Sequence, residues 1–422
     1  MSKKTYPRLG ETLHTVTMEN GLTVKLVPRP GFMRKLAYFV TDFGAVHTDF
    51  ELDGEIIHAP AGIAHFLEHK MFELPGRDVS VEFAAMGAND NAFTSYDMTA
   101  YYFSCTEHFE ENLRLLLEFV STPYFPEESV KRELGIIDQE IGMCADAPDS
   151  RVFEELMKIM YPSHPIRVPI LGSCEDLRQI TPQLLEKCHR AFYTPANMVL
   201  CVVGDVSIDT VLTVAEQVLG KEKKSVGRKL RDWHEEMTCP TAETRLSMEV
   251  GNPMFQLGFK CEAVGSGENA IRQEVIADLA AEALFGESSE LYLELYGEGI
   301  IDSSFGGGFE AVDGCALLTC GGDSQHPERI RDAILKQAAR LTREGIPEDT
   351  LLRMKRSAMG RRVRGLDSFD STCFRVSAYH LTGFDYFRFP EVYASVTAEE
   401  IQEFLTRVVT RERCALSVVE PL

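Results

Sequence analysis

The segment Pro60-Ala61-Gly62-Ile63-Ala64-His65-Phe66-Leu67-Glu68-His69-Lys70-Met71-Phe72 is the most informative stretch of this 422-residue chain. A proline suits the first turn of a helix, because its fixed φ angle is already helical. Apolar side chains recur at the spacing that gives one face of a helix, at Ile63, Phe66, Leu67 and Met71. We therefore expect an amphipathic helix that starts near Pro60.

Two histidines and a glutamate share this predicted helix. His65 and His69 are four residues apart, so both imidazoles lie on one face, about 6 Å apart along the axis. Imidazoles in this arrangement can bind one Zn²⁺. Glu68 lies at the edge of the same face, where its carboxylate can accept a proton from a water molecule beside the metal. The alternative is two unrelated histidines beside an unrelated glutamate, because such short patterns also occur by chance.

Four predicted elements of the first half of the chain recur in the same order in the second half, 215 to 221 residues later. The pairs are strands at 101–105 and 316–320, helices that open at Glu127 and Glu348, helices that open at Thr181 and Thr397, and strands at 198–203 and 414–419. The repeat predicts an α+β protein of two homologous α/β sandwich halves, each an antiparallel-rich sheet packed with helices. We place the halves at residues 1–220 and 237–422, with a polar linker at 221–236.

Composition excludes several classes of partner. The chain has 43 Lys and Arg against 65 Asp and Glu, a net charge of −22 that repels nucleic acids and anionic membranes. No uncharged apolar run approaches the ~18 residues of a membrane span. The eleven cysteines have irregular spacing, without a zinc-ribbon or redox motif. We expect a cytoplasmic protein with reduced thiols.

The pattern H-x-x-E-H at His65–His69 resembles the signature of the inverzincins, and the chain resembles the pitrilysin/insulinase family of zinc metallopeptidases. The likeness includes the short bacterial members and the catalytic subunit of the mitochondrial processing peptidase. It covers most of the chain, since Gly62–Phe72 is similar to the family's zinc helix and Asn91–Ser95 to the strand that follows. Two duplicated α/β halves are also what this resemblance implies.

The resemblance implies a third zinc ligand, a glutamate on a later helix with another glutamate seven residues before it. Glu140 and Glu133 have this spacing, so Glu140 is the expected ligand and Glu133 is expected to orient a ligating histidine. The alternative is that both are solvated helix carboxylates. At the offsets of the repeat, the second half has no histidine near 280–290 and has Arg361 in place of Glu140. We expect one zinc ion per chain.

By itself, the segment 91–95 is typical of an ordinary edge strand. The resemblance implies that the substrate backbone pairs with Asn91, Ala92, Phe93 and Thr94 as an added β-strand. The expected function is a zinc-dependent endopeptidase that cleaves peptides or unfolded segments in a closed chamber, with Glu68 as the catalytic base. The alternative is a non-catalytic assembly or recognition subunit of a related peptidase complex.

The expected partner follows from a departure from the family pattern. The family's second half commonly supplies an Arg and a Tyr from one strand, and residues 304–320 contain neither. The chain is also about half as long as the family's single-chain members. We expect a heterodimer with a related zinc-free subunit, or else a homodimer. Within the same region, Gly306–Gly308 is predicted to form a turn or loop.

Overall fold

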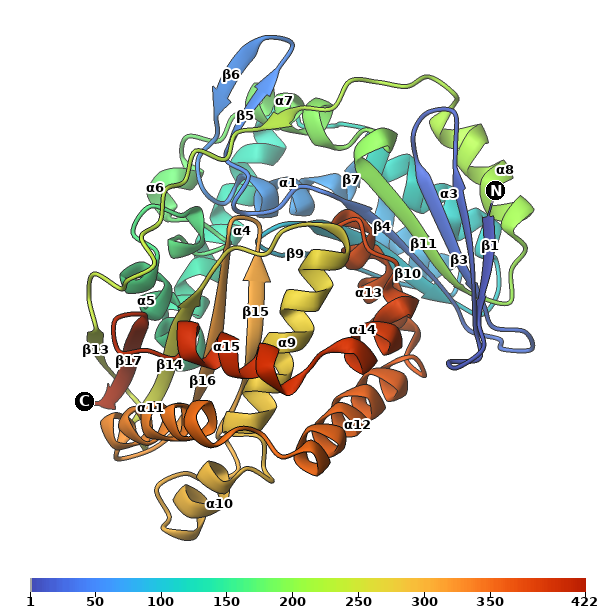
Figure 1. Cartoon of the computed structure of the whole chain (residues 1–422). Helices are drawn as coiled ribbons and strands as arrows, with labels where there is room; N and C mark the ends of the chain where they lie inside the picture. The colour runs from blue at the N-terminus through green and yellow to red at the C-terminus, as the bar shows by residue number, and fades with distance from the viewer. Residues whose placement is uncertain (1) are drawn as a thin grey trace. The chain divides into compact units, whose positions relative to one another are not determined.

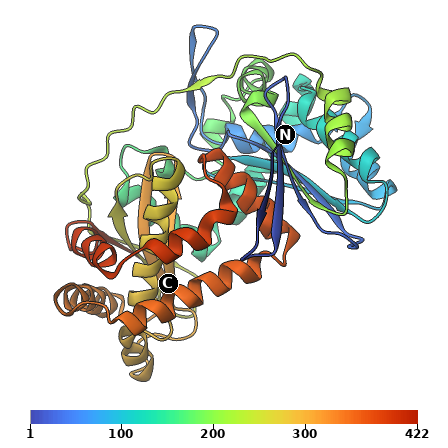
Figure 2. The ribbon, with the colours of Figure 1, turned by 45° about the vertical axis from the view of Figure 1, so that its right-hand side comes forward.

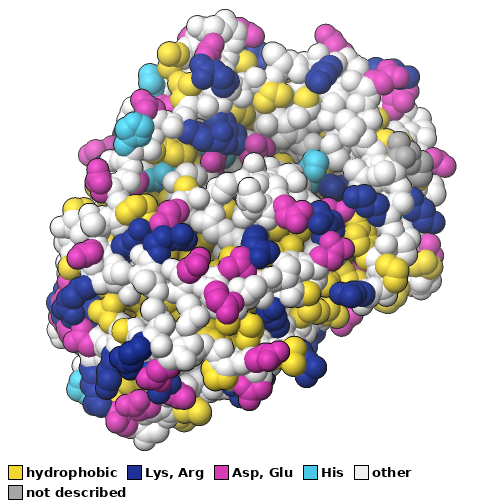
Figure 3. Space-filling view, in the orientation of Figure 1, with side chains coloured by type: hydrophobic (Ala, Val, Ile, Leu, Met, Phe, Trp, Pro, Cys, Tyr) yellow, Lys and Arg dark blue, Asp and Glu magenta, His cyan; other side chains and the backbone are white. Residues whose placement is uncertain are grey.

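A computed structural model describes residues 2–422, which group into two compact units. Unit 1 contains the residues up to Ile141 together with Pro169–Arg231 and Val363–Arg388. Unit 2 contains Gly142–Val168, Asp232–Arg362 and Phe389–Leu422. No helix in residues 2–422 has the length and apolar character needed to span a membrane. Acidic and basic side chains are interspersed over the face shown in Figure 3.

A seven-stranded sheet forms the centre of unit 1 (Figure 1). The strands, in spatial order, are β1 (Ser2–Tyr6), β2 (Glu11–Thr17), β3 (Thr23–Pro28), β11 (Met198–Gly204), β4 (Lys35–Thr41), β10 (Thr99–Cys105) and β9 (Asn89–Thr94). Neighbouring strands are antiparallel except for β3 and β11, which are parallel. β9 is an edge strand, and within residues 2–422 no further strand pairs with its other side.

Helices cover both faces of this sheet, because its central strands are apolar on both sides. One face has a row of paired residues Leu200, Phe39, Tyr101 and Ala92, which packs into the main core of the unit. The helices whose apolar residues complete that core are α1 (Ile63–Met71), α2 (Val79–Ala85), α3 (Phe109–Ser121), α4 (Glu127–Ala145), α6 (Cys174–Leu177), α7 (Pro182–Phe192) and α8 (Ile208–Leu219). Small two- and three-stranded sheets complete the unit, formed by β7 (Glu73–Leu74) with β8 (Arg77–Asp78), and by β12 (Arg228–Lys229), β5 (Asp49–Leu52) and β6 (Glu55–His58).

Unit 2 repeats the strand order of unit 1. Its sheet is β13 (Glu243–Met248), β17 (Cys414–Pro421), β14 (Met254–Cys261), β16 (Cys315–Asp323) and β15 (Gly306–Val312). The first pair is parallel and the others are antiparallel, as in β3-β11-β4-β10-β9. The predicted α+β fold with two homologous halves is therefore confirmed. Gly306–Gly308 belongs to β15, so the predicted turn is wrong: these glycines pair in register with β16.

Unit 2 contains α5 (Pro148–Met160) from the first half of the sequence, and its other helices come from the second half. These are α9 (Gly267–Phe285), α10 (Glu290–Gly297), α11 (Pro327–Glu344), α12 (Glu348–Gly365), α14 (Phe389–Ser395) and α15 (Ala398–Val408). Short 3₁₀ turns lie at Pro165–Arg167, Pro195–Asn197 and Tyr386–Arg388.

Packing exchanges one helix between the two copies of the repeat. α5 comes from the first half of the sequence but packs on β14 and β17 of unit 2. α13 (Phe369–Leu381) comes from the second half but packs on β4 and β11 of unit 1 (Figures 1 and 2). The compact units thus differ from the predicted sequence halves 1–220 and 237–422 by these two segments. One of the points at which the chain passes from unit 1 to unit 2, between Arg231 and Asp232, lies inside the predicted linker 221–236.

Two glycines fix the start of α1. The helix begins at Ile63, three residues later than the sequence suggests, because Gly62 has a left-handed φ of 84°. A Cβ atom on Gly62 would lie 2.3 Å from the carbonyl oxygen of Leu171. In turn, a Cβ atom on Gly172 would lie 2.5 Å from the carbonyl oxygen of Ala61. The two backbones touch at this crossing, which holds the histidine helix in place.

We expect Gly62→Ala to destabilise the protein more than Gly76→Ala. Both glycines have left-handed φ angles, 84° and 68°, but the space around Gly76 is open. The left-handed conformation alone costs about 1–2 kcal/mol, whereas Gly62→Ala adds a backbone clash of ~1–3 kcal/mol. Denaturant unfolding of the two variants measures the difference, and equal losses would show that the crossing with Leu171 is unimportant.

Candidate metal centre

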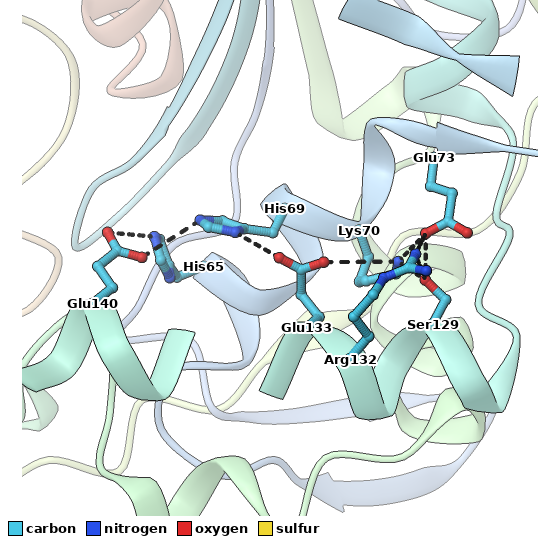
Figure 4. Close-up of polar contacts among 8 residues, drawn as sticks. All are labelled: His65, His69, Lys70, Glu73, Ser129, Arg132, Glu133 and Glu140. Carbon is cyan, nitrogen blue, oxygen red and sulfur yellow. Dashed lines mark hydrogen bonds and ion pairs between the residues drawn. The ribbon is translucent and has the colours of Figure 1, made fainter. Parts of the chain in front are cut away.

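The side chains of His65, His69 and Glu140 converge (Figure 4). The Nε2 atom of His65 lies 3.8 Å from Glu140 Oε1, and the Nε2 atom of His69 lies 3.7 Å from Glu140 Oε2. One ligand atom from each residue lies within 4.8 Å of the other two. Within residues 2–422, this is the only group of three such side chains. The structure thus brings together the three predicted zinc ligands.

The contact distances suit a metal ion better than direct hydrogen bonds. Separations of 3.7 and 3.8 Å exceed the 2.7–3.2 Å of an N–H···O bond. A tetrahedral zinc ion with ligand bonds of ~2.0–2.1 Å keeps its ligand atoms roughly 3.4 Å apart. Two imidazole nitrogens and one carboxylate are also ligands that zinc prefers. The residues present therefore fit this metal.

α4 brings Glu133 and Glu140 to the histidines. Val130 and Ile137 are buried in the core of unit 1, and Leu134 and Ile141 pack against the same core. Each of the two glutamates follows a buried residue by three positions and so lies beside the core-facing side of the helix. The spacing of seven residues then places both carboxylates along one side of α4, next to α1.

His69 is held by Glu133, as the sequence predicts. The Nδ1–H group of His69 donates to Glu133 Oε1 at 3.0 Å, which leaves Nε2 directed to Glu140. Burial opposes a charge on His69, but this hydrogen bond and the nearby carboxylates outweigh it and raise the pKa of the ring. Burial and the neighbouring His69 lower the pKa of His65 to about 4. His65 is therefore neutral at pH 7, as a metal ligand must be.

Glu68 lies beside the three converging side chains and is hydrogen-bonded to Thr94. Its Oε2 atom accepts a hydrogen bond of 2.7 Å from Thr94 Oγ1. Burial raises the pKa of the Glu68 carboxyl, and Thr94 opposes this rise. The carboxylate keeps its other oxygen for a further proton or donor. Glu68 is not one of the three side chains whose ligand atoms converge.

The predicted substrate strand is β9, the edge strand of the sheet. Ala92 and Thr94 lie on the face that carries α1, since Ala92 pairs with the core residue Tyr101. Asn91 and Phe93 lie on the opposite face, where the Phe93 ring is 5.9 Å from that of Phe374 on α13. The contact of Thr94 with Glu68 links this edge directly to the candidate base. Sequence reasoning did not predict that contact.

Sequence reasoning also missed a buried polar cluster beside Glu133. Lys70 follows His69 on α1 and contacts Glu73 and Ser129, as Figure 4 shows. The available signal was the lysine itself, a charged residue between His69 and the buried Met71 on the helix that carries the two histidines.

Unit 2 has an ion pair near the positions that correspond to the candidate ligands of unit 1. The offsets of the repeat, 215 to 221 residues, place His65 opposite positions 280–286, which include Glu282 of α9. An offset of 221, which aligns α5 and α13, places Arg361 at the position of Glu140. Arg361 Nη2 lies 2.6 Å from Glu282 Oε2. This pair joins α9 to α12 without a metal.

Comparison with known proteins identifies the family. Residues 58–173 match the family model described as Insulinase (Peptidase family M16), and residues 179–358 match the model described as the Peptidase M16 inactive domain. The chain is 34% identical over 421 residues to YmfH of Bacillus subtilis (strain 168), described as an uncharacterized zinc protease. That alignment covers 99% of this chain and 98% of YmfH.

Solved structures show the same fold. A crystal structure described as an M16-like peptidase, from Alicyclobacillus acidocaldarius, matches with a TM-score of 0.93 and 34% identity, covering 98% of this chain and 99% of that one. Pitrilysin matches with a TM-score of 0.81 and 14% identity, covering 99% of this chain but 46% of pitrilysin, a likeness in fold alone. On these similarities, the chain belongs to the M16 family of peptidases, the insulinase family.

Proposed function

We propose that this chain is a zinc-dependent endopeptidase that cleaves peptides or unfolded segments held as an extended strand. The observation that carries the proposal is the convergence of His65, His69 and Glu140, with the Glu68 carboxylate beside them. The zinc protease description of YmfH supports the choice of metal. The bound zinc ion would act as a Lewis acid that polarises the scissile carbonyl and makes water more acidic.

The side chains of this site have distinct roles in the proposed reaction. Glu68 accepts a proton from the attacking water molecule and later delivers it to the leaving amine. Thr94 holds one oxygen of Glu68 and so directs the other toward the reacting atoms. Glu133 fixes the ring of His69 through Nδ1, which keeps Nε2 available as a ligand.

The open edge of β9 supports the proposed mode of substrate binding. An extended peptide that pairs with this edge forms backbone hydrogen bonds, which do not depend on the sequence of the peptide. Because Thr94 on this strand contacts Glu68, a peptide paired with β9 passes close to the candidate base. A folded protein cannot supply a free strand, so unfolded segments are the proposed substrates.

The alternative, a non-catalytic assembly or recognition subunit, is less well supported. Such a subunit has no need for the ligands, the base and the supporting glutamate together. The convergence of the three candidate ligands and the contacts of Glu133 with His69 and of Thr94 with Glu68 therefore support the enzyme.

The eleven cysteines are free thiols, which supports a cytoplasmic location for the enzyme.

For the active form, we propose a heterodimer with a related zinc-free chain and keep a homodimer as the second candidate. Residues 304–320, which include β15, contain no Arg or Tyr to contact a substrate carbonyl.

Glu68→Gln is expected to retain zinc and lose turnover by ~10²–10⁴-fold, because the amide cannot accept a proton from water. The amide oxygen can still accept the hydrogen bond from Thr94, so the fold is preserved. Cleavage of a fluorogenic peptide library, with zinc content measured on the same samples, gives the result. Activity near that of the wild type would exclude Glu68 as the base.

Substitutions of the two glutamates of α4 are expected to lower zinc affinity to different extents. Glu140→Gln removes a ligand and is expected to lose most bound zinc, whereas Glu133→Gln disturbs only the orientation of His69 and weakens zinc binding by ~10–100-fold. Competition with a chromogenic chelator measures both affinities. If Glu133→Gln loses zinc while Glu140→Gln retains it, the two roles are reversed.

The isolated chain is expected to bind zinc but to cleave peptides slowly. Addition of a related M16 chain that lacks the H-x-x-E-H motif should raise the rate and yield a 1:1 complex in light scattering. A fully active homodimer, unaffected by any zinc-free relative, would favour the second candidate.

A further inference from the structure

Lys70 is a buried cation next to the candidate metal site. Its side chain is only 1% exposed. It lies between His69 and Met71 on α1. Burial of an ammonium group is unfavourable unless it is paired and hydrogen-bonded. An apolar side chain such as Met would fill this position without that cost. Stability alone therefore does not explain a lysine here.

The contacts of Lys70 hold its ammonium group next to α4. The Nζ atom donates to Glu73 Oε2 at 2.5 Å and to Ser129 Oγ, which itself donates to Glu73. An ammonium group has three N–H donors, and these contacts use two of them. The same Nζ atom lies 4.0 Å from Glu133 Oε2, the limit of an ion pair. Glu73 and Ser129 thus fix the ammonium group within reach of Glu133.

Each oxygen of Glu133 lies next to a different residue of α1. Oε1 accepts the hydrogen bond from His69 Nδ1 at 3.0 Å, and Oε2 faces Lys70 (Figure 4). The 4.0 Å separation is too long for a hydrogen bond, so Lys70 acts on Glu133 through its charge. Lys70 shares this charge with Glu73, its nearest carboxylate.

We propose that Lys70 is a positioning residue of the metal site, which acts through Glu133 to hold His69 in its ligating orientation. The inference rests on the proposed function, since it assigns a role toward the zinc ion that the function requires. It predicts that the effect of Lys70 on zinc affinity depends on the Glu133 carboxylate. A lysine that only stabilised the fold would act independently of Glu133.

A double-mutant cycle with Lys70→Met and Glu133→Gln tests this dependence. Zinc dissociation constants come from competition with a chromogenic chelator, on purified full-length chain. Lys70→Met alone is expected to weaken zinc binding by ~10-fold, at the lower end of the ~10–100-fold range for residues that support a ligand. In the Glu133→Gln background, Lys70→Met is expected to have little further effect. Effects that multiply would overturn the inference.

Lys260→Met is the matched control. Lys260 is also 1% exposed and pairs with Glu235 at 3.1 Å, but it belongs to unit 2. This variant undergoes the same chemical change at a buried lysine, and it should leave zinc affinity unchanged. An equal loss of zinc affinity in Lys260→Met would show that the loss in Lys70→Met comes from general destabilisation, and would overturn the inference.

Two further outcomes are decisive. If Lys70→Met does not fold, Lys70→Gln takes its place, because Gln can still hydrogen-bond to Glu73 and Ser129 without a charge. Failure of both variants to fold would assign Lys70 to the fold and overturn the proposal. A wild-type chain that binds no zinc would remove the proposed function as well, whereas zinc binding with multiplying effects would remove this inference alone.

Discussion

The position of α4 against α1 is the constraint on which the candidate site depends. The two helices are separated by more than fifty residues of sequence, and each contributes part of one ligand set. Val130 and Ile137 anchor α4 in the core of unit 1, while the glycine crossing at Gly62 anchors the start of α1. Because protein cores are close-packed, neither helix can shift without a loss of packing. The ligand atoms are therefore brought together by apolar contacts, not by the metal alone.

Repulsion among the carboxylates of the site opposes this arrangement unless a cation lies nearby. Glu68, Glu133 and Glu140 gather carboxylates around two imidazoles, and burial raises the pKa of Glu68. Lys70 lies at the limit of an ion pair with Glu133 and brings a positive charge to one side of this group. In unit 2, Arg361 on α12 and Glu282 on α9 form a direct ion pair, in which the opposite charges balance each other.

Much of the fold could be read from the sequence, because apolar periodicity and repetition are local signals. The expected strand at 101–105 falls within β10, and the helix that opens at Glu127 is α4. The exchange of α5 and α13 could not be predicted in this way, because the pattern of an amphipathic helix does not indicate which of two sheets its apolar face packs on. The glycines of β15 looked like a turn, yet pairing with β16 overrides their low strand propensity. At the site, spacing indicated the histidine pair and the family resemblance indicated Glu133 and Glu140, whereas the contacts of Thr94 and Lys70 depend on tertiary packing.

The exchange of α5 and α13 has a consequence for the origin of this architecture. Each sheet is covered by a helix that the other copy of the repeat encodes. A single copy of about 200 residues would leave that face of its sheet without its helix, unless a second copy supplied one. Such a chain would be complete only as a domain-swapped dimer. The present chain meets this requirement within one polypeptide, because it contains both copies of the repeat.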